Sequence, residues 1–395
     1  MTHWDAAVVG AGPAGSATAL LLARAGARVL LLDRARFPRD KPCSEYLSPE
    51  TTRVLERLGG GVLDAVAAAS HARLTGMKVV APSGAAMIGR FGRFGRSGSE
   101  RFSYALPRTT FDTILRRAAE AAGVEVREGV KVENLMYDRG AVGGVVARET
   151  YRARLVIGAD GLRSVVARRL GGVRTSPPRR VAFTAHVSDV AGVTDVGEMH
   201  IGRTGYVGLG PIGDGVTTVA LVVPARTLKE RPDFFDALNR FPGLAGRFNP
   251  RRLERAVLAT GPFAQWSRRS VTLGASGGGG ALLVGDAADF FDPFTGQGIY
   301  SALRGAELAA AAVIDTLTTG ASLGAYARAR RREFTGKWLL ERVIALGIGW
   351  PALAERVVGR LARRPDLADL LVRATGNCVP ARSVLAPNVL ARLLW

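Results

Sequence analysis

The sequence predicts an α/β protein whose main domain is a parallel sheet covered by helices, with a β-sheet substrate domain and a helical C-terminal tail. The first observation is an apolar run at 5–9, a glycine-rich turn, a helical pattern to Gly26 and a second apolar run at 28–32. Strand, helix and strand within about 30 residues make a βαβ unit. The second observation is alternating apolar patterning after residue 179. The third is length, because 395 residues exceed the size of one hydrophobic core.

Composition excludes several classes of protein. With 47% hydrophobic and 22% charged residues, the chain is a folded globular protein and not a disordered one. Two cysteines, Cys43 and Cys378, exclude a disulfide scaffold, and without an export signal at its start the chain is expected in the cytoplasm. The net charge is +20, but lysine occurs at only five positions, and arginine with abundant Ala and Gly is typical of GC-rich coding. Anionic lipid or substrate is the alternative source of this charge, and no motif favours nucleic acid.

The first strand–turn–helix carries a chemical signal. Gly10-x-Gly12-x-x-Gly15 provides a tight turn, a backbone without Cβ bulk and a helix N-terminus, which together bind a pyrophosphate. Asp33 ends the next strand, where a carboxylate accepts hydrogen bonds from adenosine ribose. The sequence therefore predicts dinucleotide binding, with Ala14 in the loop and Arg34 after Asp33 as further contacts.

The remaining elements follow in order. Short β-like pieces fill 76–104, where the doubled Arg-Phe-Gly of Gly89–Arg96 is a flexible hairpin or an anion-binding rim. A helix is expected over 111–122, ended by Gly123, and then strands over 124–157, ended by the turn Gly158–Gly161. A short strand at 281–284 precedes Gly285-Asp286, and a helix runs from Gly296-Gln-Gly298 to about Leu317. The tail, 326–395, is helical by its apolar period.

This interleaving predicts domains built from separated segments. The dinucleotide-binding domain takes 1–75, 101–178 and 262–325, the β-rich substrate domain takes 76–100 and 179–261, and the helical C-terminal region takes 326–395.

Two later segments carry a resemblance to a known family. Leu155–Ser164, with Asp160-Gly161, and Leu282–Ile299, with Gly285-Asp286, resemble the flavoprotein hydroxylase superfamily that includes para-hydroxybenzoate hydroxylase. The resemblance implies that fold and bound FAD. It places Asp160 and Gly161 near the pyrophosphate, Asp286 at the ribityl chain, and Pro293, Gly296, Gly298 and Ile299 by the flavin ring. It adds Arg108 at the head of a helix and the backbone of Val132 at the adenine.

The segment Pro42-Cys43-Ser44-Glu45 resembles the Pro-Cys-Gly-Glu region of the geranylgeranyl reductase branch of this superfamily, with Ser44 where the branch usually has Gly. The resemblance carries over Cys43 and Ser44 as flavin contacts. Because no second cysteine lies near Cys43 in sequence, packing against the cofactor is expected and not thiol redox chemistry.

The same resemblance leaves several reactions open. The sequence favours a single-component flavin monooxygenase that hydroxylates or epoxidises a hydrophobic phenolic, polyketide or isoprenoid lipid through a C4a-hydroperoxyflavin, with NAD(P)H as a transient electron donor. The alternative is a geranylgeranyl reductase-like enzyme that saturates isoprenoid double bonds. Against it, Tyr206-Val-Gly208-Leu-Gly210-Pro211 has Gly at both aromatic positions of that branch's motif. A flavin-dependent halogenase, whose Trp pair is missing here, and a non-catalytic flavin-binding protein are further alternatives.

No side chain stands out as an acid or base for the substrate. The flavin itself is expected to carry the chemistry, with Cys43, Glu45 and Tyr206 as candidate catalytic residues and no metal. Of the four histidines, His186 and His200 fall in the substrate domain, where a structural role is expected.

The tail contains twelve apolar residues at 343–354, flanked by Arg342 and Arg356. The run is too short to span a bilayer. It is either a core-packing helix or a peripheral contact with the inner membrane face, with Trp350 at headgroup depth. Whether the protein is a monomer or a dimer stays open.

Overall fold

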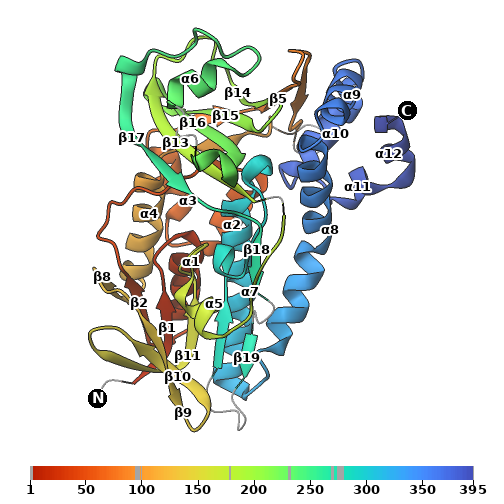
Figure 1. The fold of residues 1–395 in the computed structure, drawn as a ribbon. Helices are drawn as coiled ribbons and strands as arrows, with labels where there is room; N and C mark the ends of the chain where they lie inside the picture. The colour runs from red at the N-terminus through yellow and green to blue at the C-terminus, as the bar shows by residue number, and fades with distance from the viewer. Residues whose placement is uncertain are drawn as a thin grey trace.

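The computed structural model describes residues 3–93, 98, 100–177, 179–229, 233–267, 271–273 and 280–394. Its fold confirms the predicted class. A mainly parallel sheet packed against helices lies at one end of the molecule, a second sheet lies at the other end, and the C-terminal helices run along one side (Figure 1).

The first sheet is built around β1 (Trp4–Val9), which is parallel to β2 (Val29–Asp33) and β11 (Thr150–Gly158). Its strand order is β19-β20-β11-β1-β2-β8. The remaining strands are β8 (Glu125–Glu128), β19 (Val271–Leu273) and β20 (Gly280–Leu283), with β9 (Asn134–Asp138) and β10 (Ala141–Val146) as an antiparallel extension of β11. All five residues of β2 are buried, as expected for a central strand covered on both faces.

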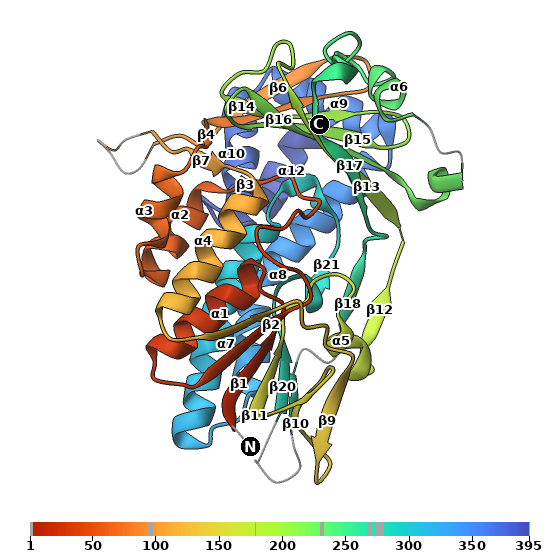
Figure 2. The same cartoon turned by 90° about the vertical axis from the view of Figure 1, so that its left-hand side faces the viewer.

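Helices cover one face of this sheet, as Figure 2 shows for α1, α4 and α7. They are α1 (Pro13–Arg24), α2 (Pro49–Leu58), α3 (Val62–Ala68), α4 (Arg108–Ala121) and α7 (Gly298–Thr319), and the short α5 (Val165–Arg169) follows β11. The core between helices and sheet includes Leu20, Leu31, Phe111 and Leu303. Helix α1 begins at Pro13, because proline fits the first helical position.

The second sheet has seven strands in the order β17-β13-β16-β15-β14-β5-β6. They are β5 (Gly76–Val80), β6 (Ala86–Arg90), β13 (Arg180–Ser188), β14 (Val196–Ile201), β15 (Tyr206–Gly213), β16 (Val216–Pro224) and β17 (Leu253–Thr260). One face packs on Leu238, Phe241 and Leu244, in or after α6 (Phe234–Asn239). The 3-10 turns η1 (Ala225–Lys229) and η2 (Pro250–Arg252) flank α6. Of the Gly89–Arg96 run, 94–96 lie outside the described residues, and Arg93 forms a bridge with Glu100.

Two small sheets and two 3-10 turns lie between the larger sheets. One small sheet joins β3 (Tyr46–Leu47), β4 (Ala72–Leu74) and β7 (Ser103–Ala105), and the other joins β12 (Val173–Thr175), β18 (Gln265–Ser267) and β21 (Asp289–Phe290). The turns are η3 (Gly285–Ala287) and η4 (Pro293–Thr295), which precede α7. The cofactor motifs predicted from sequence therefore fall in loops between the sheets.

The tail is helical, as predicted. It consists of α8 (Gly324–Ile348), α9 (Pro351–Ala362), α10 (Pro365–Thr375), α11 (Arg382–Leu385) and α12 (Pro387–Leu394). Figure 1 shows α8 running from the first sheet to the second. The apolar run 343–354 is not one helix, because Pro351 starts a new one after Trp350. None of the helices among the described residues combines the length and apolar character needed to cross a bilayer.

Candidate functional site

The turn between β1 and α1 can exist only with glycine at two positions. Gly10 has φ +99°, and a Cβ there would lie 2.5 Å from the carbonyl oxygen of Ala159. A Cβ on Gly15 would lie 1.8 Å from the carbonyl oxygen of Gly10. Gly12 is the N-cap of α1 and offers no side-chain cap, so the amides of the first helical turn, including Ala14 and Gly15, are free to bind an anion.

Asp33 supports this turn from the end of β2. One carboxylate oxygen accepts a hydrogen bond from the amide of Ala11 at 2.7 Å, and the other accepts one from the amide of Ala35 at 2.8 Å. The carboxylate is thereby fixed beside the glycine turn. Arg34, the next residue, is exposed.

Two arginines face the same turn, and a lysine lies in the neighbouring loop. A Cβ placed on Gly12 would stand 3.3 Å from a terminal guanidinium nitrogen of Arg39 and 4.0 Å from one of Arg108. Lys41 lies 3.5 Å from the Asp286 carboxylate. Two guanidinium groups and the free amides of a helix N-terminus can each donate hydrogen bonds to a diphosphate and balance its negative charge. The site thus fits the diphosphate of a dinucleotide.

Arg108 is itself held rigidly. Two of its nitrogens donate to the two carboxylate oxygens of Asp112, both at 2.7 Å, and both side chains are buried. Burial alone would lower the pKa of Arg108, but Asp112 outweighs it and raises that pKa, so the group stays cationic. The sequence identified Arg108 but missed Asp112, which follows it by one helical turn.

The Asp160-Gly161 turn after β11 adds a buried carboxylate oxygen that could accept a hydrogen bond from a ligand. Oδ2 of Asp160 accepts a hydrogen bond from the amide of Val165 at 2.6 Å, whereas Oδ1 is buried and finds none among the described residues. Burial raises the pKa of this carboxyl. Gly161 has φ +77°, and a Cβ there would lie 3.6 Å from Nζ of Lys41.

The loop from Asp292 to Gly298 is braced from two sides. Asp292 accepts hydrogen bonds from the Tyr206 hydroxyl and from Arg180, both at 2.6 Å, and caps η4 through the amide of Phe294. Burial and Asp292 raise the pKa of Tyr206 far above its usual value, so Tyr206 acts as a neutral donor to the loop.

Helix α7 begins at the end of this loop. Gly296 has φ +66°, and a Cβ there would lie 2.9 Å from the ring of Tyr46. The first turn of α7, with Gly298 and Ile299, has no side-chain cap, which leaves amides free for a negatively charged ring edge.

Glu45 of the Pro-Cys-Ser-Glu loop pairs with a histidine, a contact that the sequence did not reveal. Glu45 is fully buried with φ +60°, and its carboxylate accepts from the amide of Arg108 at 3.0 Å. Its other oxygen lies 2.6 Å from Nε2 of His186, which is 141 residues away in sequence. Cys43 Sγ accepts from the Glu45 amide at 3.3 Å. His200 differs, because both its nitrogens have neighbouring partners, the Pro242 carbonyl and Glu198, as expected for a structural histidine.

The remaining predicted residues lie in these elements or beside them. Ser44 lines the cavity described next, and Val132 is buried in the loop before β9. The residues that sequence reasoning missed are Arg39, Lys41, Asp112 and His186. The first two come directly before the Pro42-Cys43-Ser44-Glu45 segment, where two positive charges beside a predicted cofactor loop were a usable signal.

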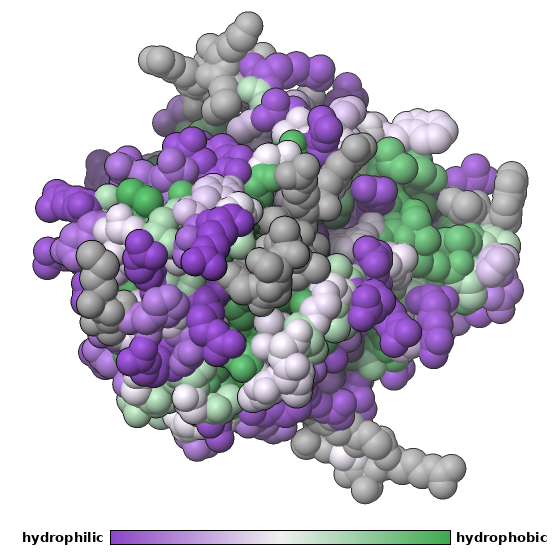
Figure 3. Space-filling view, turned by 90° about the horizontal axis from the view of Figure 1, so that it is seen from below, coloured by the Kyte–Doolittle hydropathy of each residue, from purple (hydrophilic) through white to green (hydrophobic). Residues whose placement is uncertain are grey.

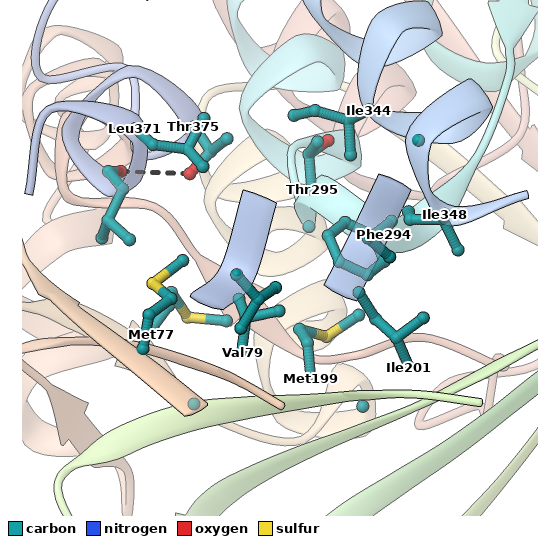
Figure 4. A pocket seen from close by; sticks show the side chains of 18 of the residues that line it. Met77, Val79, Met199, Ile201, Phe294, Thr295, Ile344, Ile348, Leu371 and Thr375 are labelled. Carbon is teal, nitrogen blue, oxygen red and sulfur yellow. Dashed lines mark hydrogen bonds between the residues drawn. The ribbon is translucent and has the colours of Figure 1, made fainter. Parts of the chain in front are cut away.

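A large cavity of about 340 Å³ begins at this loop cluster. Its near end includes Ser44, Gly210, Thr218 and the Pro293–Gly296 turn. It continues between the second sheet, with Met77, Val79, Met199 and Ile201, and the C-terminal helices, with Ile344, Ile348 and Leu371 (Figure 4). None of the described residues that line it is charged, and the polar side chains among them are the hydroxyls of Ser44, Tyr46, Thr218, Thr295 and Thr375. Such a cavity selects an apolar ligand by size and burial.

The chain matches the family described as FAD binding domain over residues 3–337. It is 31% identical to menaquinone reductase of Mycolicibacterium smegmatis, covering 96% of this chain and 92% of that protein. It is 30% identical to digeranylgeranylglycerophospholipid reductase of Methanosarcina acetivorans, covering 80% of this chain and 76% of that protein. It is 28% identical to conditioned medium factor receptor 1 of Dictyostelium discoideum over 79% of this chain, and spans only 63% of that protein's length.

Solved structures share the fold. A flavoprotein/dehydrogenase from Cytophaga hutchinsonii superposes with a TM-score of 0.83 at 21% identity, covering 98% of this chain and 96% of that one. The myxobacterial chondrochloren halogenase gives 0.75 at 24% identity, with 86% and 80% covered. A probable FAD-dependent monooxygenase from Pseudomonas aeruginosa gives 0.72 at 21% identity, with 90% and 99% covered. At these identities the likeness concerns the fold alone.

Proposed function

The chain belongs to the FAD binding domain family and is an FAD-dependent oxidoreductase, and from this premise we propose that it reduces a carbon–carbon double bond in a long apolar chain, such as that of an isoprenoid lipid. The observation that carries the proposal is the cavity of about 340 Å³, whose lining, among the residues that the structure describes, carries no charge and which extends from the cofactor loops to the C-terminal helices. A long hydrocarbon gains about 0.8 kcal/mol for each methylene buried there.

The relatives support this choice over oxygen transfer. The menaquinone reductase and the digeranylgeranylglycerophospholipid reductase, 31% and 30% identical to this chain, are matched over 92% and 76% of their own length, and both are named as reductases. The monooxygenase and halogenase are similar only in fold. We therefore rank the reductase first, although the sequence alone favoured a monooxygenase.

The chain's own residues would hold the cofactor and the substrate in place. The amides of Ala14 and Gly15, with Arg39 and Arg108, would bind the diphosphate, and Asp33 would bind the adenosine ribose. A bound flavin would supply the two electrons of the reduction as a hydride.

The loop next to the ring would need to be rigid. Tyr206 and Arg180, both bonded to Asp292, hold the Pro293–Gly296 turn, and the apolar cavity walls exclude water from the reacting carbons. These residues orient the reactants and do not themselves exchange electrons.

We infer that NAD(P)H is the electron donor and binds transiently. In sequence, only one glycine fingerprint follows a strand and opens a helix. Mixing the anaerobic holoprotein with NADH or NADPH should bleach the flavin absorbance, and failure with both would reject this donor and favour a non-catalytic flavin protein.

A monooxygenase is the second candidate because of one observation. Gly208 and Gly210 line the cavity where the reductase branch usually carries aromatic side chains, which leaves room for a ring-bearing substrate. Gly210 is open enough that a Cβ would meet only ordinary contacts, 3.7 Å from Thr218 and 4.0 Å from Ser44.

One experiment separates the two reactions. The holoprotein is incubated with NADPH and either a menaquinone or a geranylgeranyl lipid, with and without oxygen. The masses of the products are then measured by mass spectrometry. A reductase adds two hydrogen atoms and works anaerobically. A product that gains one oxygen atom, formed only with oxygen uptake, would contradict the proposal and establish the monooxygenase.

We propose that the substrate enters from an anionic membrane surface. Four large apolar side chains form a stripe at helical spacing along and just beyond α8: Leu339, Val343, Leu346 and Trp350 are 52%, 42%, 70% and 64% exposed. Val343 also lines the cavity, so the stripe borders it. Figure 3 shows apolar surface on the side where the C-terminal helices lie, bordered by hydrophilic residues.

Charge complements this stripe. Residues 326–395 carry 13 basic and 5 acidic side chains, and Arg342 and Arg356 flank the apolar run. An amphipathic surface with flanking arginine binds the interface of anionic lipids.

Cosedimentation with phosphatidylglycerol vesicles tests this surface. Leu346→Glu with Trp350→Glu should lower the bound fraction about tenfold or more, because each removes a large apolar contact and adds a repelled charge. The exposed pair Leu253→Glu and Tyr137→Glu, in β17 and β9, is the control. Equal partitioning of the two double variants would reject the membrane surface.

A further inference from the structure

Helix α8 places a buried lysine and a buried glutamate against the loop that leads into α7. Lys337 donates to the carbonyl oxygen of Gln297 at 3.3 Å and to the hydroxyl of Ser301. Its Nζ lies 3.8 Å from Oε1 of Glu341, one helical turn further on. A second, small cavity of about 40 Å³ is lined by Gln297, Lys337 and Glu341, among others. None of these groups is needed to bind the diphosphate.

Thr295 connects this polar cluster to the large cavity. Its side chain lines the cavity, close to Ile344 and Phe294 (Figure 4). Its hydroxyl also donates to Oε1 of Glu341 at 3.4 Å. By contrast, the hydroxyls of Thr218 and Thr375 donate to the backbone carbonyls of Cys43 and Val372. Among the described cavity-lining hydroxyls, Thr295 is therefore the one that contacts a carboxyl side chain.

The surroundings of Glu341 allow it to hold a proton near neutral pH. Burial raises its pKa, and Lys337 on α8 lowers it. Asp289 in β21 and Asp292 before η4 raise it again, Thr295 lowers it, and the balance is a pKa of about 7. Burial likewise lowers the pKa of Lys337.

The neighbouring carboxylates are themselves paired. Asp289 contacts Arg330 and accepts from the indole of Trp338, and Asp292 contacts Arg180 and Tyr206. Glu341 lacks an arginine partner in the contacts that the described residues make, which leaves it the carboxyl of this cluster best able to change its protonation state.

We propose that Glu341 stores a proton and that Thr295 delivers it to the substrate in the large cavity. The proposal rests on the reductase function, because saturation of a double bond adds a hydride to one carbon and a proton to the other. The two electrons come from the flavin, reduced by NAD(P)H. When Glu341 is protonated, its carboxyl donates to the Thr295 oxygen and the Thr295 hydroxyl is free to turn toward the alkene. As the new C–H bond forms, the Thr295 O–H bond breaks, the Glu341 carboxyl proton moves to the Thr295 oxygen, and Glu341 is left as a carboxylate beside Lys337.

The first test does not depend on turnover. Infrared difference spectra of the flavin-free protein, recorded from pH 5 to pH 9, should contain a carboxylic acid C=O band that is lost with a midpoint near pH 7. The band should be missing in Glu341→Gln and present in Glu133→Gln, an exposed control. A wild type whose spectra contain no such band would overturn the role of Glu341.

The second test uses single-turnover reduction of the alkene by holoprotein that NADPH has already reduced. Thr295→Val and Glu341→Gln should slow alkene reduction about a hundredfold and abolish its decline above pH 7. Thr295→Ser should restore most of the rate. Thr316→Val, whose hydroxyl donates to the Ala312 carbonyl within α7, should match the wild type.

The outcomes separate the two levels of inference. If the wild type reduces an alkene and Thr295→Val does so equally fast, the proton route is wrong although the reductase assignment stands. If Tyr46→Phe and not Thr295→Val blocks the reaction, the phenol that lines the same cavity is the donor and the proposal is overturned. If the wild type reduces no double bond at all, the reductase assignment fails, and the route through Thr295 with it.

Discussion

Replacement of Gly15 by alanine should weaken FAD binding by at least a hundredfold. A Cβ there would lie 1.8 Å from the carbonyl oxygen of Gly10, and since such atoms do not approach closer than 3.0 Å, the gap must widen by 1.2 Å. The movement separates α1 from the glycine turn and redirects the amides of Ala14 and Gly15. Hydrogen bonds to a charged group contribute about 1.5–3 kcal/mol each. Losing two therefore weakens FAD binding by about 3–6 kcal/mol, or roughly 10²- to 10⁴-fold.

Two further glycine variants make this prediction specific. The new Cβ of Gly12→Ala would meet the flexible end of Arg39 at 3.3 Å and be in ordinary contact with Arg108 at 4.0 Å, so the apoprotein should keep its Tm. The same Cβ would occupy space that the diphosphate needs, so FAD should bind more weakly. Gly359→Ala, in α9 with nothing within 4 Å, should bind FAD normally and gain up to about 1 kcal/mol of stability.

The assay is calorimetric titration of FAD into each apoprotein, with the Tm recorded in parallel. Gly15→Ala should lose both affinity and apoprotein stability, because the clash lies within the fold itself. A Gly15→Ala protein with the wild-type Kd for FAD would refute the assignment of this turn as the diphosphate site.

Two other predictions concern the cavity and its acid. Gly210→Phe fills the cavity next to Ser44, so the KM for a long alkene should rise tenfold or more in steady-state assays. The Kd for FAD should stay within about twofold of the wild-type value. An unchanged KM would mean that the substrate binds elsewhere. Glu341 has its pKa raised from 4.5 to about 7 on folding, so the folded protein binds this proton more tightly and its stability must fall as pH rises from about 4.5 to 7. The free energy of unfolding should fall by up to about 3 kcal/mol over this range in the wild type, and Glu341→Gln should not show this fall. Chemical denaturation at several pH values measures it. Parallel curves of unfolding free energy against pH for the two proteins would contradict the prediction.

Local motifs were predictable because they depend on backbone geometry within a few residues. Gly10 has a positive φ and Gly15 has no room for a Cβ, so the turn itself requires glycine at these two positions. The place of Asp33 at the end of the next strand follows from the usual length of a βαβ unit. The Gly285-Asp286 and Gly296–Gly298 turns are of the same kind. Helix starts were less certain: α4 begins at Arg108, three residues before the predicted start, because apolar period marks the middle of a helix better than its end.

The apolar run 343–354 shows how a local pattern can fit two interpretations at once. Some of its residues, such as Ile344 and Ile348, line the cavity as core-packing residues, whereas Leu346 and Trp350 are exposed. Hydropathy could not divide the run, because which side of a helix is covered depends on what packs against it.

The sequence by itself determined the cofactor fold, since each of its motifs is a short stretch of chain whose conformation is set by its own residues. Only the tertiary structure decided what surrounds the cofactor loops. It brought Glu45 to His186 across 141 positions, turned Arg39 and Arg108 toward Gly12, and placed Thr295 between the cavity and Glu341. These contacts depend on how two sheets and a long helix pack together. Neither the spacing of motifs along the chain nor its composition contains that information.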